Sequence, residues 1–264
     1  MNIGASTACF YPLETELSLE RVGKLGFKTA ELFMNSFSEM EDGFVSGLCN
    51  IKEEYGINIC SMHPFASFAE SYTLFSSYER RYHDSLELYK RFFEIMNRLG
   101  AGIFVVHGGK IPGSIDDELY FERFGEFGRI GSSYGVIVAQ ENVVHYRSES
   151  PDFLKRMRAY IGDEFKMVLD VKQALRAGYS PYEFTEPLHD SIVHIHVSDH
   201  DSEHDCTPPG EGVFDFGKLF GTMNSYGYRG EYIIELYSSG FTDDSQLIAS
   251  RDMLEKEFSR ISCK

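Results

Sequence analysis

The sequence lacks the patterns of secreted, membrane-spanning and disulfide-stabilised proteins. Its five cysteines are an odd number, lie far apart and form no Cys-x-x-Cys pair, so we expect reduced thiols. No apolar run approaches the ~20 residues that span a bilayer. Residues 1–9 begin directly in a strand-like run, without the basic region and apolar segment of a signal peptide. The sequence therefore predicts a cytoplasmic protein without a membrane partner.

Positive charge is also scarce. The 264 residues include 25 Lys and Arg against 41 Asp and Glu, which gives a formal net charge of −16. A field of this sign repels phosphate backbones and anionic membrane surfaces, so we expect no nucleic-acid partner. The same excess of acid is compatible with cation binding.

The chain also contains no linker-like or low-complexity stretch and no tryptophan. Hydrophobic residues make up 42% of it, and its aromatic residues are 22 Phe and 16 Tyr, so we expect a large aromatic core. A chain of this length is within the range of a single large α/β domain. We predict one domain over residues 1–264, which is also compatible with assembly into a homo-oligomer.

Eight short apolar runs each precede a segment with helical spacing. The longest such segment, 78–99, repeats large apolar residues at steps of three and four. We expect Ser18 to cap the first helix and Asp215 to cap the helix before the last strand. The runs expected to form strands are 3–9, 29–34, 57–63, 103–107, 136–143, 165–170, 192–197 and 231–236.

This alternation predicts parallel strands joined by right-handed helical crossovers. Eight repeats in about 250 residues match the count and length of a closed barrel. The predicted fold class is therefore α/β, a single (β/α)8 TIM barrel. The alternative is a doubly wound open sheet, but the first strand is not followed by its usual glycine fingerprint.

Six of the expected strands end in a side chain that can bind a metal ion or transfer a proton. In a (β/α)8 barrel these C-terminal strand ends form the floor of the active site. Burying several carboxylates together costs several kcal/mol per ion unless they hold a cation or share protons. Each residue alone has a structural explanation, but the set predicts a metal centre. Its members are His63, His107, Glu141, Asp170, His196 and Glu235.

At these residues the sequence resembles the xylose-isomerase-like barrel superfamily of sugar isomerases, epimerases and zinc apurinic endonucleases. The resemblance covers nearly the whole chain. It rests on Gln140-Glu141-Asn142, Leu169-Asp170, the run from His194 to Asp199 followed by Pro209-Gly210-Glu211-Gly212, and Ile234-Glu235.

The resemblance implies one divalent ion held by Glu141, Asp170, His196 and Glu235. Three carboxylates and one imidazole favour Mn²⁺ or Mg²⁺, with Co²⁺ and Zn²⁺ as alternatives. The resemblance also implies a second metal at His63, His107 and Glu141. Otherwise the two histidines line the substrate pocket.

The sequence departs from the endonucleases at their third zinc. A histidine of that site is replaced by Gln173, and its Asp-x-His pair aligns with His204 and Cys206. Together with the net charge, this argues against cleavage at abasic sites. In the epimerases a histidine at the Gln173 position contacts substrate, so we expect Gln173 to be a substrate-binding residue.

The resemblance implies a metal-dependent isomerase or epimerase of a small sugar or sugar phosphate. It would act by proton transfer through a metal-stabilised enediolate, with Glu141 and Glu235 as the acid and base. Hydride transfer between the two carbons stays open. The alternatives are a lyase or dehydratase of an inositol-like or keto acid substrate, a two-metal phosphodiester hydrolase, and a metal-free barrel that binds a small ligand.

Several smaller features complete the expected site. Phe10, Phe65 and Phe68 follow strand ends and are candidates to wall the apolar face of a sugar. Glu31, near the end of the second expected strand, either faces the pocket or pairs with a neighbour. We interpret Pro209-Gly210-Glu211-Gly212 as a structural turn.

Overall fold

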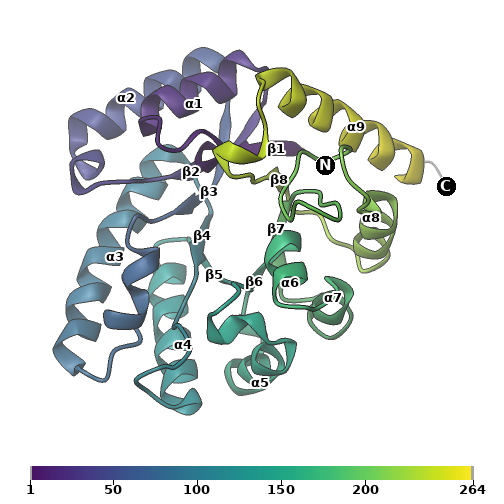
Figure 1. The fold of residues 1–264 in the computed structure, drawn as a ribbon. Coiled ribbons are helices and arrows are strands. Elements are labelled where there is room, and N and C mark those ends of the chain that lie inside the picture. Colours follow the sequence, from purple (N-terminus) through teal and green to yellow (C-terminus); the bar gives the residue numbers. More distant parts are fainter. Residues whose placement is uncertain (1, 263–264) are drawn as a thin grey trace.

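Eight short parallel strands pair in sequence order and close into a barrel, and helices surround it (Figure 1). This computed structural model describes residues 2–262. The predicted TIM barrel is confirmed. Parallel strands are buried on both faces, which explains why they were visible in the sequence as unbroken apolar runs. The strands are β1 (Ile3–Ser6), β2 (Thr29–Phe33), β3 (Asn58–His63), β4 (Ile103–Val106), β5 (Ile137–Glu141), β6 (Met167–Asp170), β7 (Ile192–Val197) and β8 (Tyr232–Ile234).

The helices form the outer ring, and two of them follow β6. Within residues 2–262, no helix combines the length and apolar character needed to cross a membrane. They are α1 (Thr15–Lys24), α2 (Asp42–Tyr55), α3 (Glu79–Leu99), α4 (Asp117–Ser133), α5 (Pro151–Ile161), α6 (Val171–Arg176), α7 (Tyr182–Leu188), α8 (Phe216–Ser225) and α9 (Asp244–Ser262). Short 3-10 turns occur at η1 (Thr7–Phe10), η2 (Phe37–Met40), η3 (Ser67–Tyr72), η4 (Arg147–Glu149), η5 (Gly162–Glu164) and η6 (Ser238–Gly240).

The two predicted helix caps had different outcomes. Asp215 caps α8, and its side chain accepts a hydrogen bond from the backbone N–H of Lys218. The predicted cap at Ser18 is wrong, because α1 begins at Thr15 and Ser18 lies inside its first turn. The Thr15 hydroxyl donates to the backbone carbonyl of Phe33 at 3.2 Å, which ties the start of the helix to the end of β2.

The hydrophobic core lies mainly between the strands and the helices. Its centre is a cluster of interlocking rings, in which Phe104 of β4 packs edge-on against Tyr89, Phe93 and Phe127. These four residues are fully buried. The aromatic core expected from the composition is therefore confirmed.

Apolar side chains form a second, small cluster of Val105, Ala139 and Val168. Because side chains alternate along a strand, Glu141 and Asp170 lie on the same face of β5 and β6, two residues further on. On that face, the side chain is apolar at one position and acidic two residues further toward the carboxyl end of the strand.

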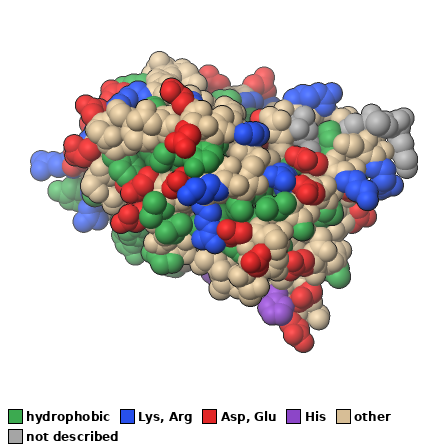
Figure 2. Space-filling model, turned by 90° about the horizontal axis from the view of Figure 1, so that it is seen from above, with side chains coloured by type: hydrophobic (Ala, Val, Ile, Leu, Met, Phe, Trp, Pro, Cys, Tyr) green, Lys and Arg blue, Asp and Glu red, His purple; other side chains and the backbone are tan. Residues whose placement is uncertain are grey.

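Acidic and basic side chains are mixed on the face of the molecule that Figure 2 shows. On the face in Figure 2 red and blue side chains are interspersed, with hydrophobic side chains scattered between them. On that face the negative charge of the chain is not gathered into one patch.

A buried carboxyl group joins the segments that follow β3 and β4. Glu70, in η3, is 0% exposed and accepts a hydrogen bond from the backbone N–H of Gly108. Its other oxygen has no hydrogen-bond partner among the described residues. Burial raises the pKa of Glu70 to about 8. The free energy of unfolding should therefore depend on whether Glu70 is protonated.

We expect Glu70→Gln to remove a pH dependence from the stability of the metal-free protein. Between the ordinary pKa of 4.5 and the folded value of about 8, the folded state keeps a proton that the unfolded chain has lost. Stability must therefore fall as pH rises through this window, by up to roughly 4–5 kcal/mol. Urea unfolding at pH 5 and pH 8 measures the effect. The exposed Glu53→Gln is the control, and equal pH slopes in all three proteins would contradict the prediction.

Candidate functional site

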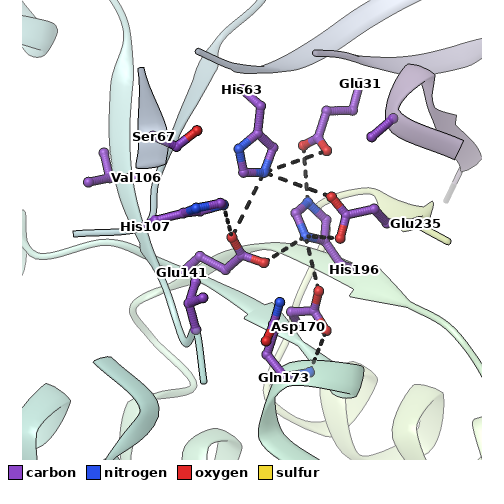
Figure 3. Close-up of polar contacts among 12 residues, drawn as sticks. Glu31, His63, Ser67, Val106, His107, Glu141, Asp170, Gln173, His196 and Glu235 are labelled. Atoms are coloured by element: carbon purple, nitrogen blue, oxygen red, sulfur yellow. Dashed lines mark hydrogen bonds and ion pairs between the residues drawn. The ribbon is translucent and has the colours of Figure 1, made fainter. Parts of the chain in front are cut away.

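The carboxyl ends of the strands bring all six predicted residues into one cluster (Figure 3). His63, Glu141 and Asp170 are the last residues of β3, β5 and β6. His196 lies within β7, while His107 and Glu235 directly follow β4 and β8. The strand register aligns these positions, since Asp170 pairs with His196 across β6 and β7.

His196 lies at the centre of the first predicted ligand set. Its Nδ1 atom is 3.3 Å from Glu141 Oε1, 3.6 Å from Glu235 Oε2 and 3.7 Å from Asp170 Oδ2. A tetrahedral ion with bonds of about 2.0–2.2 Å holds its ligand atoms about 3.4 Å apart. The four side chains therefore have the spacing and the chemistry to hold one divalent ion.

Burial and neighbouring charges shift the pKa values of Glu141 and His196 in opposite directions. Burial alone would raise the pKa of Glu141, but contacts with His107 and His196 hold it well below its usual value. Burial would lower the pKa of His196, but Glu31 and Glu235 raise it well above its usual value. Without a metal ion, a proton on His196 supplies the positive charge that the surrounding carboxylates favour.

His63 and His107 form a second group with Glu141. Nε2 of His107 is 3.1 Å from Glu141 Oε2. Nε2 of His63 is 3.9 Å from the same oxygen and makes no hydrogen bond within the described chain. Burial lowers the pKa of His63, whereas the Glu141 contact raises the pKa of His107 against the effect of burial. These three side chains also have the donor atoms for an ion.

Glu31 pairs with neighbouring histidines of this cluster, which is the second of the two alternatives that the sequence left open for it. It is 0% exposed, and one of its oxygens lies 3.0 Å from Nε2 of His196. Its other oxygen is 3.9 Å from Nε2 of His63 and accepts no hydrogen bond within residues 2–262. The only signal in the sequence was an acid inside an apolar strand.

Lys172 is a site residue that the sequence did not predict. It lies in the first turn of α6 with its side chain 3% exposed. Its Nζ atom is 3.0 Å from Glu235 Oε2 and 3.4 Å from Asp170 Oδ2. A lone lysine at the start of a helix normally faces solvent, so nothing in the sequence indicated this position.

The Lys172 ammonium affects the acids beside it differently. Burial would raise the pKa of Glu235, but Lys172 and His196 lower it overall. Burial raises the pKa of Asp170, and Lys172 offsets this only in part. For Lys172 itself, burial lowers the pKa, but Asp170 and Glu235 raise it well above its usual value. In the metal-free protein the lysine is therefore charged.

A cavity of about 540 Å³ opens beside the cluster. Gln173, the predicted substrate-binding residue, lines it, and its side-chain oxygen accepts a hydrogen bond from the backbone N–H of Val144 at 3.3 Å. The other lining residues are Ala8, Tyr11, Phe33, Asn35, Phe65, Phe68, His107, Glu141, Lys172, Glu235, Leu236 and Tyr237.

Two of the three aromatic residues expected at the pocket lie there. Phe65 and Phe68 line the cavity, but the prediction for Phe10 is wrong. The first strand ends at Ser6, and the chain then turns through η1. This turn places Phe10 in the core, where it packs edge-on against Phe241 with ring centroids 6.2 Å apart.

The loop after β7 has a structural role in this arrangement. Asp199 accepts hydrogen bonds from the backbone N–H groups of Gly210, Gly212 and Phe214 at 2.9–3.1 Å, as expected for a structural turn. His204 is exposed and contacts Asp201. Cys206 is buried, and neither residue belongs to a potential metal-binding group among the residues that the structure describes.

Solved structures share this fold over nearly their whole length. A D-tagatose 3-epimerase-like protein superposes with a TM-score of 0.82 at 21% identity, covering 99% of this chain and 98% of the other. D-psicose 3-epimerase from Clostridium cellulolyticum gives 0.77 at 17% identity, with 98% and 99% coverage. The IolI protein, described with a bound zinc atom, gives 0.79 at 16% identity, with 99% coverage of both chains.

The model of the xylose isomerase-like TIM barrel family matches residues 19–257. This span includes every residue of the cluster described above. The resemblance inferred from the strand-end motifs is thereby confirmed. The chain belongs to the xylose isomerase-like TIM barrel family.

Proposed function

We propose that the protein is a divalent-metal-dependent isomerase or epimerase of a small sugar or sugar phosphate. The observation that carries this proposal is the ring of carboxylate oxygens within 3.7 Å of His196 Nδ1, beside a cavity of about 540 Å³. Sugar epimerases of the same fold support it.

Glu141, Asp170, His196 and Glu235 would hold the ion, with Mn²⁺ favoured by the three carboxylates. When bound, the ion would neutralise negative charge that develops on two neighbouring substrate oxygens. The three carboxylates carry three negative charges, and a divalent ion together with Lys172 balances them.

Glu141 and Glu235 would exchange protons with the substrate. Both line the cavity, and both have pKa values below the usual range, so both are ionised at neutral pH. Glu141 ends β5 and Glu235 directly follows β8, with β6 and β7 between them in the barrel, so they can approach a bound sugar from two directions. One carboxylate would take a proton from carbon, and the other would return one to the opposite face.

The remaining cavity residues would bind the sugar. Phe33, Phe65 and Phe68 offer apolar surface for the carbon-bound hydrogens of the ring. Asn35 and Gln173 offer amide groups for its hydroxyls. This combination of apolar walls and few polar groups is typical of sites for small polar ligands.

A two-metal phosphodiester hydrolase is the second candidate, because His63, His107 and Glu141 could hold another ion. The loss of third-site ligands at Gln173, His204 and Cys206 weighs against it. The number of ions per chain distinguishes the two functions, since one favours the isomerase and two or three favour the hydrolase.

We expect the metal-free protein to bind one Mn²⁺ per chain, and Asp170→Asn to weaken this binding at least tenfold. The amide loses the charge that attracts the cation. Isothermal titration calorimetry measures the affinity, and elemental analysis gives the count. The control is Asp190→Asn, a carboxylate that pairs with Arg158 on the surface. Equal affinity of the two variants would rule out Asp170 as a ligand.

In D₂O, the Mn²⁺-loaded protein should place deuterium on the sugar carbon next to the carbonyl during turnover of a ketose. Proton transfer exchanges that hydrogen with solvent, whereas hydride transfer does not. A screen of ketoses and their phosphates followed by NMR detects the label. Glu235→Gln should lower kcat by about 10²–10⁴-fold. Turnover without deuterium would contradict the proposed mechanism.

Lys172→Met should destabilise the metal-free protein by about 3–5 kcal/mol, because Asp170 and Glu235 then lack their buried counter-charge. Chemical unfolding in the presence of a chelator measures the change. Lys90→Met, which removes an exposed ion pair with Glu87, should leave stability nearly unchanged. An equally small effect at Lys172 would contradict its role as the internal cation.

A further inference from the structure

Glu31 uses its two oxygens very differently. Its Oε2 atom accepts from Ser61 Oγ at 2.8 Å and lies 3.2 Å from Nε2 of His194 and 3.0 Å from Nε2 of His196. All four of these side chains are buried. One carboxylate oxygen therefore serves three neighbours in a part of the barrel interior closed to water.

The contact with His196 determines which ring nitrogen keeps its hydrogen when the imidazole is neutral, as a metal-binding histidine must be. Oε2 of Glu31 accepts the hydrogen bond of Ser61, and toward this acceptor oxygen Nε2 of His196 is the donor. Neutral imidazole has a single N–H, so donation from Nε2 leaves the lone pair on Nδ1. Nδ1 is the atom that faces Glu141, Asp170 and Glu235.

The residues around Glu31 hold it in this orientation. The Ser61 hydroxyl donates to Oε2 and also lies 3.1 Å from Nε2 of His194. Oε2 of Glu31 therefore already acts as a hydrogen-bond acceptor toward Ser61.

We propose that Glu31 is a positioning residue that fixes the tautomer and ring orientation of His196, so that Nδ1 points to the metal ion. The inference rests on the metal of the proposed function. Carboxylates that accept the second N–H of a metal-binding histidine orient the ring and make the ligand more basic. Glu31 is placed to do both.

The rival role for Glu31 is that of a ligand. Its Oε1 atom, together with His63, His196 and Glu235, could hold an ion. A positioning residue acts only through His196, so Glu31→Leu should weaken Mn²⁺ binding no further in a His196→Gln background, whereas a ligand would weaken it there as well. A double-mutant cycle therefore separates the two roles.

The experiment compares Glu31→Gln and Glu31→Leu with the wild type. Glutamine keeps the shape and a weaker acceptor, while leucine removes the acceptor. Glu39→Gln is the matched control, because Glu39 is also buried but bonds to Thr15 and Asn35 outside the cluster. Circular dichroism establishes that each variant is folded.

We expect Mn²⁺ affinity to fall about 10- to 100-fold in Glu31→Leu and less in Glu31→Gln, with the number of ions unchanged. In ¹⁵N-labelled protein the hydrogen-bonded Nε2–H signal of His196, assigned from its loss in His196→Gln, should disappear in Glu31→Leu. This signal is also readable in the metal-free protein, so it tests the contact independently of the ion.

Affinities in both Glu31 variants equal to that of Glu39→Gln would overturn the proposal while leaving the metal site intact. A further loss of affinity when Glu31→Leu is added to His196→Gln would overturn it in favour of the ligand role. If neither the wild type nor the Glu39 control binds a divalent ion, the proposed function fails together with the inference.

Discussion

The main physical constraint on the site is that several carboxylates lie close together inside a closed barrel. Glu31, Glu141, Asp170 and Glu235 lie within one buried cluster, where each ionised carboxylate repels the others. Removing such charges from water costs several kcal/mol per ion unless positive charge is close. Lys172 and the surrounding imidazoles supply part of that charge, and a divalent ion would supply the remainder.

The barrel makes this concentration geometrically possible. Its strands run in one direction and pair in order, so their carboxyl ends meet at one face. Val105, Ala139 and Val168 are apolar side chains on the inner face of the barrel. Two residues further along each strand, the inner side chain is an acid or an imidazole. An apolar plug therefore lies directly beneath the polar cluster and raises the cost of leaving its charges unbalanced.

The residues of the cluster lie in two layers, and each layer has a different role. Glu141 and Glu235 line the cavity and can reach a ligand, whereas Glu31, Ser61 and His194 lie deeper and contact only protein. The deeper layer holds His196 in one orientation. The side chains that would touch substrate are therefore supported by the deeper side chains, which contact other protein groups.

Local sequence patterns determined most of the fold and the six strand-end residues, because burial on both faces requires unbroken apolar runs that end at the pocket. They failed where tertiary contacts compete with local preference, as at Ser18, where Thr15 bonds to β2, and at Phe10, where an early turn redirects the chain. Only the tertiary structure decided that Lys172 points inward and that Glu31 bonds to His196. The contacts of Lys172 with Glu235 and of Glu31 with His196 join residues far apart in sequence, so spacing along the chain carries no signal of them.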